Sequence, residues 1–247
     1  MMMEYEEYRF SPAQTVKYGF FYCMLIMTAA YVFYDSVWAF AALLPAVFVF
    51  FRFVKRDLIV KRKDMLKIQF RDMIDSVASA LRAGYSVENA FYESRKDMMR
   101  LHGRDSYIVR ELDQFFSKLD NGVPLENILN DFAGRTQIED ISDFSEIFVL
   151  AKRNGGDFNG IIGKTVKIMK EKDETEKEIS VILSGRRYEQ RVMCIIPIGI
   201  IIYLRITSRE FLSVLYHNVP GMIVMTACLI IYAASYLISR KLIDIRV

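Results

Sequence analysis

The densest group of side chains able to do chemistry is acidic and lies past the middle of the chain. Glu139, Asp140, Asp143 and Glu146 are close enough to share two turns of a helix. Asp140 and Asp143 fall on adjacent turns, and their carboxylate oxygens could hold a hard cation. A negatively charged helix N-terminus with a solvated face explains the same residues without a ligand, and we favour it. A third interpretation, in which this face meets a basic patch on a partner, stays open.

The other residue types that carry enzyme chemistry occur in arrangements that predict none. The two histidines, His102 and His217, fall in an expected loop and near an expected hairpin tip. Cys23, Cys194 and Cys228 lie inside apolar runs, where we expect the thiols to be small buried hydrophobes, and their spacing matches neither a zinc site nor a disulfide framework. GxxxxGK[ST], GxSxG and HExxH motifs do not occur in the sequence. We therefore predict a protein that is not an enzyme and binds no cofactor or metal.

The distribution of apolar residues predicts two kinds of solvent. Most of the long uncharged runs lie within residues 18–54 and 192–238, whereas the middle is rich in Lys, Arg, Asp and Glu. A net charge of +3, without a basic stripe that carries aromatic residues, argues against nucleic acid. We expect lipid around the two ends of the chain and water around its centre.

The first apolar region has the pattern of a membrane hairpin. Residues 18–34 and 37–51 are uncharged, and about 20 apolar residues cross a bilayer as a helix. Only Asp35 and Ser36 separate the two runs, which predicts a tight antiparallel pair retained as an anchor. We expect Pro45 to kink the second helix.

The second apolar region predicts another pair of spanning helices. Residues 222–238 form a clear candidate, whereas residues 192–204 are short for a crossing. The shorter run spans if Arg191 and Arg205 extend their charged ends toward the headgroups. The apolar runs contain no Asp, Glu, Lys or His. Ionisable residues inside spanning helices usually mark a transport pathway, so the runs give no indication of one.

Basic residues beside the apolar runs predict the orientation, because cytoplasmic loops carry the excess of Lys and Arg. Both termini and the centre should face the cytoplasm, and both hairpin tips the outside. The basic residues that we place at the membrane neck are Arg52, Lys55, Arg56, Arg186, Arg187 and Arg191.

The central region has apolar residues at helical spacing and predicts a bundle of about six helices. Its last helix should pass through the charged residues 170–178 and could continue past Arg191 into the membrane as a stalk. Ser86 should cap one helix and Pro124 should take the first position of another. The residues expected at turns and helix ends are Gly84, Ser86, Gly122, Pro124, Gly155 and Gly156.

The predicted fold class is an all-α membrane protein with two N-terminal and two C-terminal transmembrane helices around a cytoplasmic helical domain. The expected segments are a cytoplasmic tail (1–17), a first hairpin (18–54), the cytoplasmic domain (55–191), a second hairpin (192–238) and a cytoplasmic tail (239–247).

Several short motifs of the central region resemble a known family. Residues 69–72 (QFRD) and 81–91 (LRAGYSVENAF) resemble the opening of the type II secretion system F domain. Residues 121–125 (NGVPL), 133–136 (AGRT) and 151–158 (AKRNGGDF) are similar to its middle turn, a helix end and a late Gly-Gly break. The resemblance covers about residues 64–197. Two spans before a single F domain resemble the TadB branch, from tight-adherence (Flp) pilus machines.

The resemblance implies a non-enzymatic platform in the inner membrane for assembling a type IV-like pilus or for a similar secretion system. Such platforms couple a cytoplasmic hexameric ATPase to the extraction of pilin from the bilayer, beside a paralogous TadC-like subunit. It also implies a homo- or hetero-oligomer. The alternative from a different class is a membrane-anchored regulatory or signalling protein whose helical domain binds a soluble partner.

Overall fold

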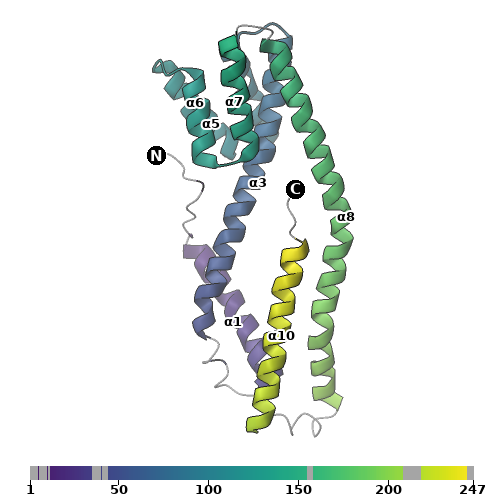
Figure 1. The fold of residues 1–247 in the computed structure, drawn as a ribbon. Coiled ribbons are helices and arrows are strands. Elements are labelled where there is room, and N and C mark those ends of the chain that lie inside the picture. The colour runs from purple at the N-terminus through teal and green to yellow at the C-terminus, as the bar shows by residue number, and fades with distance from the viewer. Residues whose placement is uncertain are drawn as a thin grey trace. The chain divides into compact units, whose positions relative to one another are not determined.

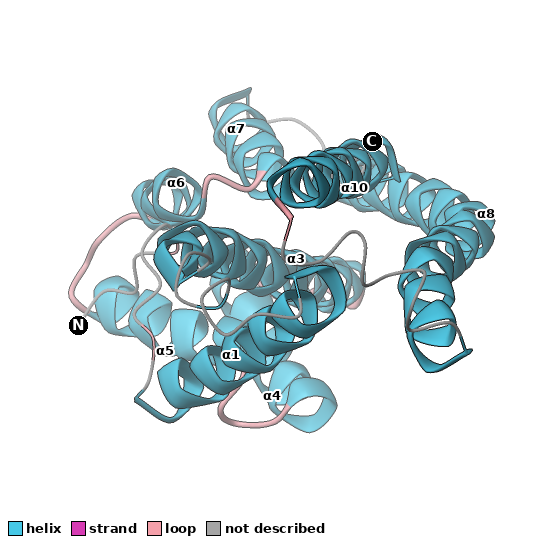
Figure 2. Ribbon diagram, turned by 90° about the horizontal axis from the view of Figure 1, so that it is seen from below, coloured by secondary structure: helices cyan, strands magenta, loops and turns pink. Residues whose placement is uncertain are grey.

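The computed structural model describes residue 5, residue 10, and residues 12–34, 40, 44–154, 158–207 and 218–243 (Figure 1). Within these residues every regular element is a helix, as Figure 2 shows, which confirms the predicted all-α class. In chain order the elements are α1 (Pro12–Tyr34), η1 (Leu44–Ala46), α3 (Val47–Arg82), α4 (Val87–His102), α5 (Tyr107–Asp120), α6 (Leu125–Thr136), α7 (Glu139–Asn154), α8 (Phe158–Thr207) and α10 (Val219–Ile243).

The chain divides into two compact units. We call Tyr5 with Val54–Glu174 the core unit, and Phe10–Phe53 with Thr175–Val247 the apolar unit. The boundary between Phe53 and Val54 falls inside α3, and the boundary between Glu174 and Thr175 falls inside α8. These two helices therefore contribute residues to both units. No loop therefore separates the units at these two crossings.

The core unit is built on the apolar stripes that the sequence predicts. Leu66, Phe70, Met73, Val77 and Leu81 recur every three or four residues along α3, and all five are buried. Aromatic rings from other helices close around this stripe. The ring of Phe70 lies 5.7 Å from that of Phe144 on α7 and 6.1 Å from that of Phe132 on α6, in tilted and edge-on contacts typical of protein cores.

Two of the predicted turns follow from glycine's freedom to adopt positive φ. Gly84 (φ 92°) ends α3, and the backbone N–H of Tyr85 donates to the carbonyl of Ala80 at 3.2 Å. Gly122 (φ 80°) does the same after α5. Ser86 caps α4 as predicted, with its Oγ accepting from the backbone N–H of Asn89 at 3.4 Å. Gly155 and Gly156 lie outside the described residues.

Two proline predictions are wrong in position. Pro124 is the residue before α6, and its carbonyl accepts the first helical hydrogen bonds, from the N–H groups of Asn127 and Ile128. Pro45 does not kink a long helix; it lies in the 3₁₀ turn η1, directly before α3 begins at Val47. The reason is shared, because proline lacks an N–H and restricts the residue before it, which suits the start of a helix.

Helix α8 passes from the core unit into the apolar unit as one helix of 50 residues, as the stalk prediction requires, with Pro197 inside it. A window of α8 and the segment Pro220–Ser239 are long and apolar enough to cross a membrane. None of the α8 window is buried within the chain. These two helices indicate association with a membrane; the spans expected in residues 18–34 and 37–54 stay predictions.

Three polar contacts join helices inside the apolar unit. The hydroxyls of Tyr34 on α1 and Thr226 on α10 lie 2.9 Å apart. The guanidinium of Arg205 on α8 donates to the carbonyl of Tyr31 on α1 and lies 3.7 Å from the centre of its ring. The Tyr232 hydroxyl of α10 donates to the carbonyl of Cys194 on α8 at 2.6 Å. Such contacts strengthen helix association where no water competes.

We predict that Phe70→Ala leaves a cavity among packed rings. The free energy of the unfolding that exposes the backbone amides of α6 and α7 to exchange should fall by about 3–5 kcal/mol. Hydrogen exchange on the full chain in detergent measures this quantity. The matched control is Phe48→Ala on the same helix, since Phe48 is 81% exposed. Equal protection in both variants would contradict the aromatic core.

Candidate functional site

Two groups of ion pairs in the core unit are built around the buried carboxylates Asp140 and Glu111, and the first centres on Asp140. This carboxylate, near the start of α7, is 3% exposed. Nε and Nη2 of Arg71 on α3 reach its Oδ2 at 2.7 and 2.6 Å, and Nζ of Lys172 on α8 reaches its Oδ1 at 3.1 Å. Charge-assisted hydrogen bonds of this length are among the stronger polar contacts in proteins. Asp140 therefore ties α7 to both α3 and α8.

Further ion pairs extend this group along α8. Nη1 of Arg71 lies 2.5 Å from Asp173, and Lys170 lies 2.7 Å from Asp75. The charged stretch at residues 170–178 reaches across to α3 or α7 through three side chains, those of Lys170, Lys172 and Asp173. The start of α8 is therefore anchored in the core unit by charge as well as by apolar packing.

The chemistry of Asp140 disfavours the cation site considered from the sequence. Both of its oxygens face positively charged side chains, which would repel a metal ion. Among the described residues, no group of three or more His, Cys, Asp or Glu side chains gathers in a way that could hold a metal. Asp140 is buried and paired, so the solvated-face interpretation is wrong for this residue. The periodicity of the sequence does not reveal its partners, Arg71 and Lys172.

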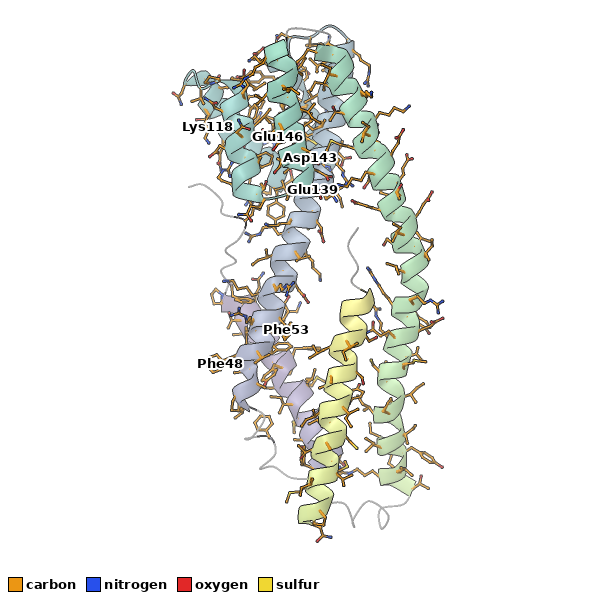
Figure 3. All side chains as sticks on the ribbon, viewed as in Figure 1. Phe48, Phe53, Lys118, Glu139, Asp143 and Glu146 are labelled. Carbon is orange, nitrogen blue, oxygen red and sulfur yellow. The ribbon has the colours of Figure 1, made fainter. Side chains whose placement is uncertain are left out.

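The rest of the acidic cluster does face solvent. Glu139, Asp143 and Glu146 are exposed, and Figure 3 shows them spaced along α7. Partial burial raises the pKa of Asp143 above its usual value, and the negative charges of Glu139, Asp140 and Glu146 raise it further, against the opposing effect of Lys172. Ionised Asp143 is therefore less favourable in the folded chain than in water.

The second group of ion pairs joins α5 to α6. Arg135 binds Glu111 through two parallel hydrogen bonds, Nη2 to Oε2 at 2.7 Å and Nη1 to Oε1 at 3.1 Å. Its Nε also donates to Asp131 at 3.0 Å, and Nζ of Lys118 donates to the same carboxylate oxygen at 2.7 Å. The hydroxyl of Tyr5, a fully buried side chain, donates to Glu111 Oε1 at 2.9 Å.

The pKa shifts of Arg135, Asp131 and Tyr5 keep these three residues in their ordinary charge states. Burial would lower the pKa of Arg135, but hydrogen bonds to Glu111 and Asp131 raise it overall. Burial would raise the pKa of Asp131, but Lys118 and Arg135 lower it overall. Burial and then Glu111 raise the pKa of Tyr5. A general acid or base needs the opposite, a pKa moved toward neutral pH. The arrangement suits a structural clamp.

Sequence reasoning missed Glu111 and Tyr5, whose partners lie elsewhere along the chain. Glu111 lies among the apolar positions of α5, where it is 5% exposed, and a charge on a buried face was the available signal. Tyr5 belongs to an N-terminal stretch that was expected to be a tail. The cavity beside Glu111 and Arg135 has a volume of about 20 Å³, roughly enough for one water molecule.

Other predicted residues are placed as follows. His102 was expected in a loop, but it is the last residue of α4, and its Nε2 lies 2.8 Å from Asp72 on α3. His217 lies outside the described residues. Cys194 is half-buried, whereas Cys23 and Cys228 are exposed on α1 and α10, so burial within the chain is wrong for these two. The exposed basic residues of the membrane neck are Arg52, Lys55 and Arg56 on α3 and Arg186, Arg187 and Arg191 on α8.

Comparison of the chain with protein-family models, with curated proteins and with solved structures finds no match.

We predict opposite effects for two isosteric substitutions one turn apart on α7. Asp140→Asn should destabilise the core unit by about 3 kcal/mol, because it removes the buried negative charge that Arg71 and Lys172 share. Asp143→Asn should leave stability unchanged or raise it at neutral pH. A raised folded pKa means that the ionised carboxylate weakens the fold above that pKa, and the amide removes this effect.

Hydrogen exchange of the α7 and α8 amides at pH 7 measures both variants. A loss of protection in Asp143→Asn as large as that in Asp140→Asn would contradict the assignment of the buried clamp.

Proposed function

We propose that this protein is a non-enzymatic, multi-pass platform of the cytoplasmic (inner) membrane in a type IV-like (Flp) pilus assembly or similar secretion machine. In this proposal the core unit lies in the cytoplasm, binds a hexameric ATPase, and works beside a TadC-like subunit. The apolar unit contributes four spanning helices and contacts pilin. The motif resemblance to the F-domain family, over about residues 64–197, motivates the choice of machine.

The observation that carries the proposal is the continuity of α8 from a charged anchor into an apolar segment. Lys172 and Asp173 are bound to Asp140 and Arg71 in the core unit. The same helix continues to Thr207, with Pro197 inside it, and includes an apolar window long enough to span a bilayer. A displacement of the anchored end would pass along the helix through its backbone hydrogen bonds, as coupling a motor to membrane helices requires.

The contacts inside the apolar unit support the proposed topology. Tyr31 and Tyr34 end α1, Arg205 is near the end of α8, and Thr226 is near the start of α10. Their contacts bring together the helix ends that lead into the two expected hairpin tips. Both tips would then face the same side of the membrane, opposite the basic residues. Arg205 is thereby stabilised by a carbonyl and a ring on α1.

The ion-pair groups of the core unit support a mechanical role. The first group joins helices that are distant in the sequence, and the second joins α5, α6 and Tyr5. The shifted pKa values of Arg135 and Asp131 favour their charged forms. Such clamps resist a relative movement of the helices they join, which favours transmission of force over chemistry at these residues.

We predict that single cysteines at the hairpin tips react with a membrane-impermeant maleimide from outside the cell. Asp35→Cys and His217→Cys, in a chain whose three native cysteines are alanine, should be labelled in intact cells. Arg104→Cys in the core unit should be labelled only after permeabilisation. Labelling of Arg104→Cys in intact cells, or of the tips only after permeabilisation, would overturn the topology.

A second prediction tests mechanical coupling through α8. Ser180→Pro, at an exposed position of the helix, should abolish pilus output while the ATPase still co-purifies, because proline breaks a helix at a cost of about 3 kcal/mol. Ser180→Ala is the matched control and should retain output. Normal pilus output with Ser180→Pro would refute coupling through α8. Normal pilus output in a strain that lacks the gene would refute the platform function itself and favour a regulatory protein.

A further inference from the structure

We propose that Arg187 and Arg191 on α8 form a binding site for the phosphate group of an anionic phospholipid. Tyr188 and Ile195 would line the path of the lipid toward its acyl chains. This inference rests on the part of the proposed function that inserts α8 into a membrane, and it adds a specific ligand to that helix.

The spacing places these residues on one face of the helix. Arg187, Arg191 and Ile195 follow one another at intervals of four residues, so their side chains lie on successive turns. Tyr188 is adjacent on the same side of the helix. All four side chains are exposed, Tyr188 by 70% and Ile195 by 67%. The face therefore changes from two cations to apolar surface within about three turns.

The two arginines lack a counter-charge. Within the residues that the structure describes, their side chains take part in no ion pair or hydrogen bond. Arginines one turn apart repel each other, and an anion between them removes that repulsion. Arg186 provides a contrast in the same turn, because its Nη1 is paired with Glu189 at 3.1 Å on a different side of the helix. The chain thus neutralises one of three neighbouring arginines and leaves two available.

The chemistry of the site matches a phospholipid headgroup. A guanidinium binds phosphate through paired N–H donors, and two of them one turn apart can share one phosphate. Tyrosine is enriched at the membrane–water boundary, where its ring contacts apolar chains and its hydroxyl meets water. The apolar window of the same helix follows, with none of its surface buried in the chain. Basic residues beside a spanning helix typically bind anionic lipids.

The test measures which lipids the purified full chain retains from nanodiscs containing equal amounts of phosphatidylcholine and phosphatidylglycerol. Native mass spectrometry of the ejected complex gives the ratio of the two lipids. We expect phosphatidylglycerol to be enriched on the unmodified chain. Arg191→Gln should reduce the enrichment about fivefold, and Arg187→Gln with Arg191→Gln about 25-fold, since each basic residue near an anionic surface contributes a factor of about five.

Arg186→Gln is the matched control, because it removes the same charge from the same turn at a residue that is already paired. It should leave the enrichment unchanged. An equal loss in Arg186→Gln would show a response to overall charge and overturn the site. Retained enrichment in the double variant would also overturn it.

Flotation with vesicles of pure phosphatidylcholine separates this inference from the proposed function. A chain that floats with these vesicles but shows no preference for phosphatidylglycerol supports membrane insertion and refutes the lipid site. A chain that floats with no vesicle refutes both.

Discussion

The core unit depends on a buried carboxylate that three helices share. Asp140 loses its hydration in the folded chain, which is costly unless positive charges replace the water. Arg71 and Lys172 do so from α3 and α8, the two helices that also contribute residues to the apolar unit. Because one carboxylate is the shared partner of both cations, the three helices are stabilised as a set. The start of α8 therefore has a defined position among the helices of the core unit.

The second clamp applies the same physics to a different pair of helices. Apolar burial supplies most of the driving force for folding, but it has no direction. The two parallel hydrogen bonds between Arg135 and Glu111 do have direction and tie α5 to α6. Tyr5 adds a third partner from the N-terminal segment. We infer that the aromatic core supplies stability while the two clamps select the arrangement of its helices.

These features agree with a protein that acts by transmitting movement. A mechanical element needs a rigid connection, and α8 combines a charged anchor with an apolar segment in one helix. In the proposed platform, the anchor receives motion from the ATPase and the exposed arginines position the helix in the headgroup layer.

The sequence by itself determined features that depend on neighbouring residues. The buried stripe of α3, the turns at Gly84 and Gly122 and the cap at Ser86 follow from helical periodicity and local backbone preferences. Tertiary structure decided which charges are buried, because Asp140 and Glu111 meet partners far along the chain that periodicity does not reveal.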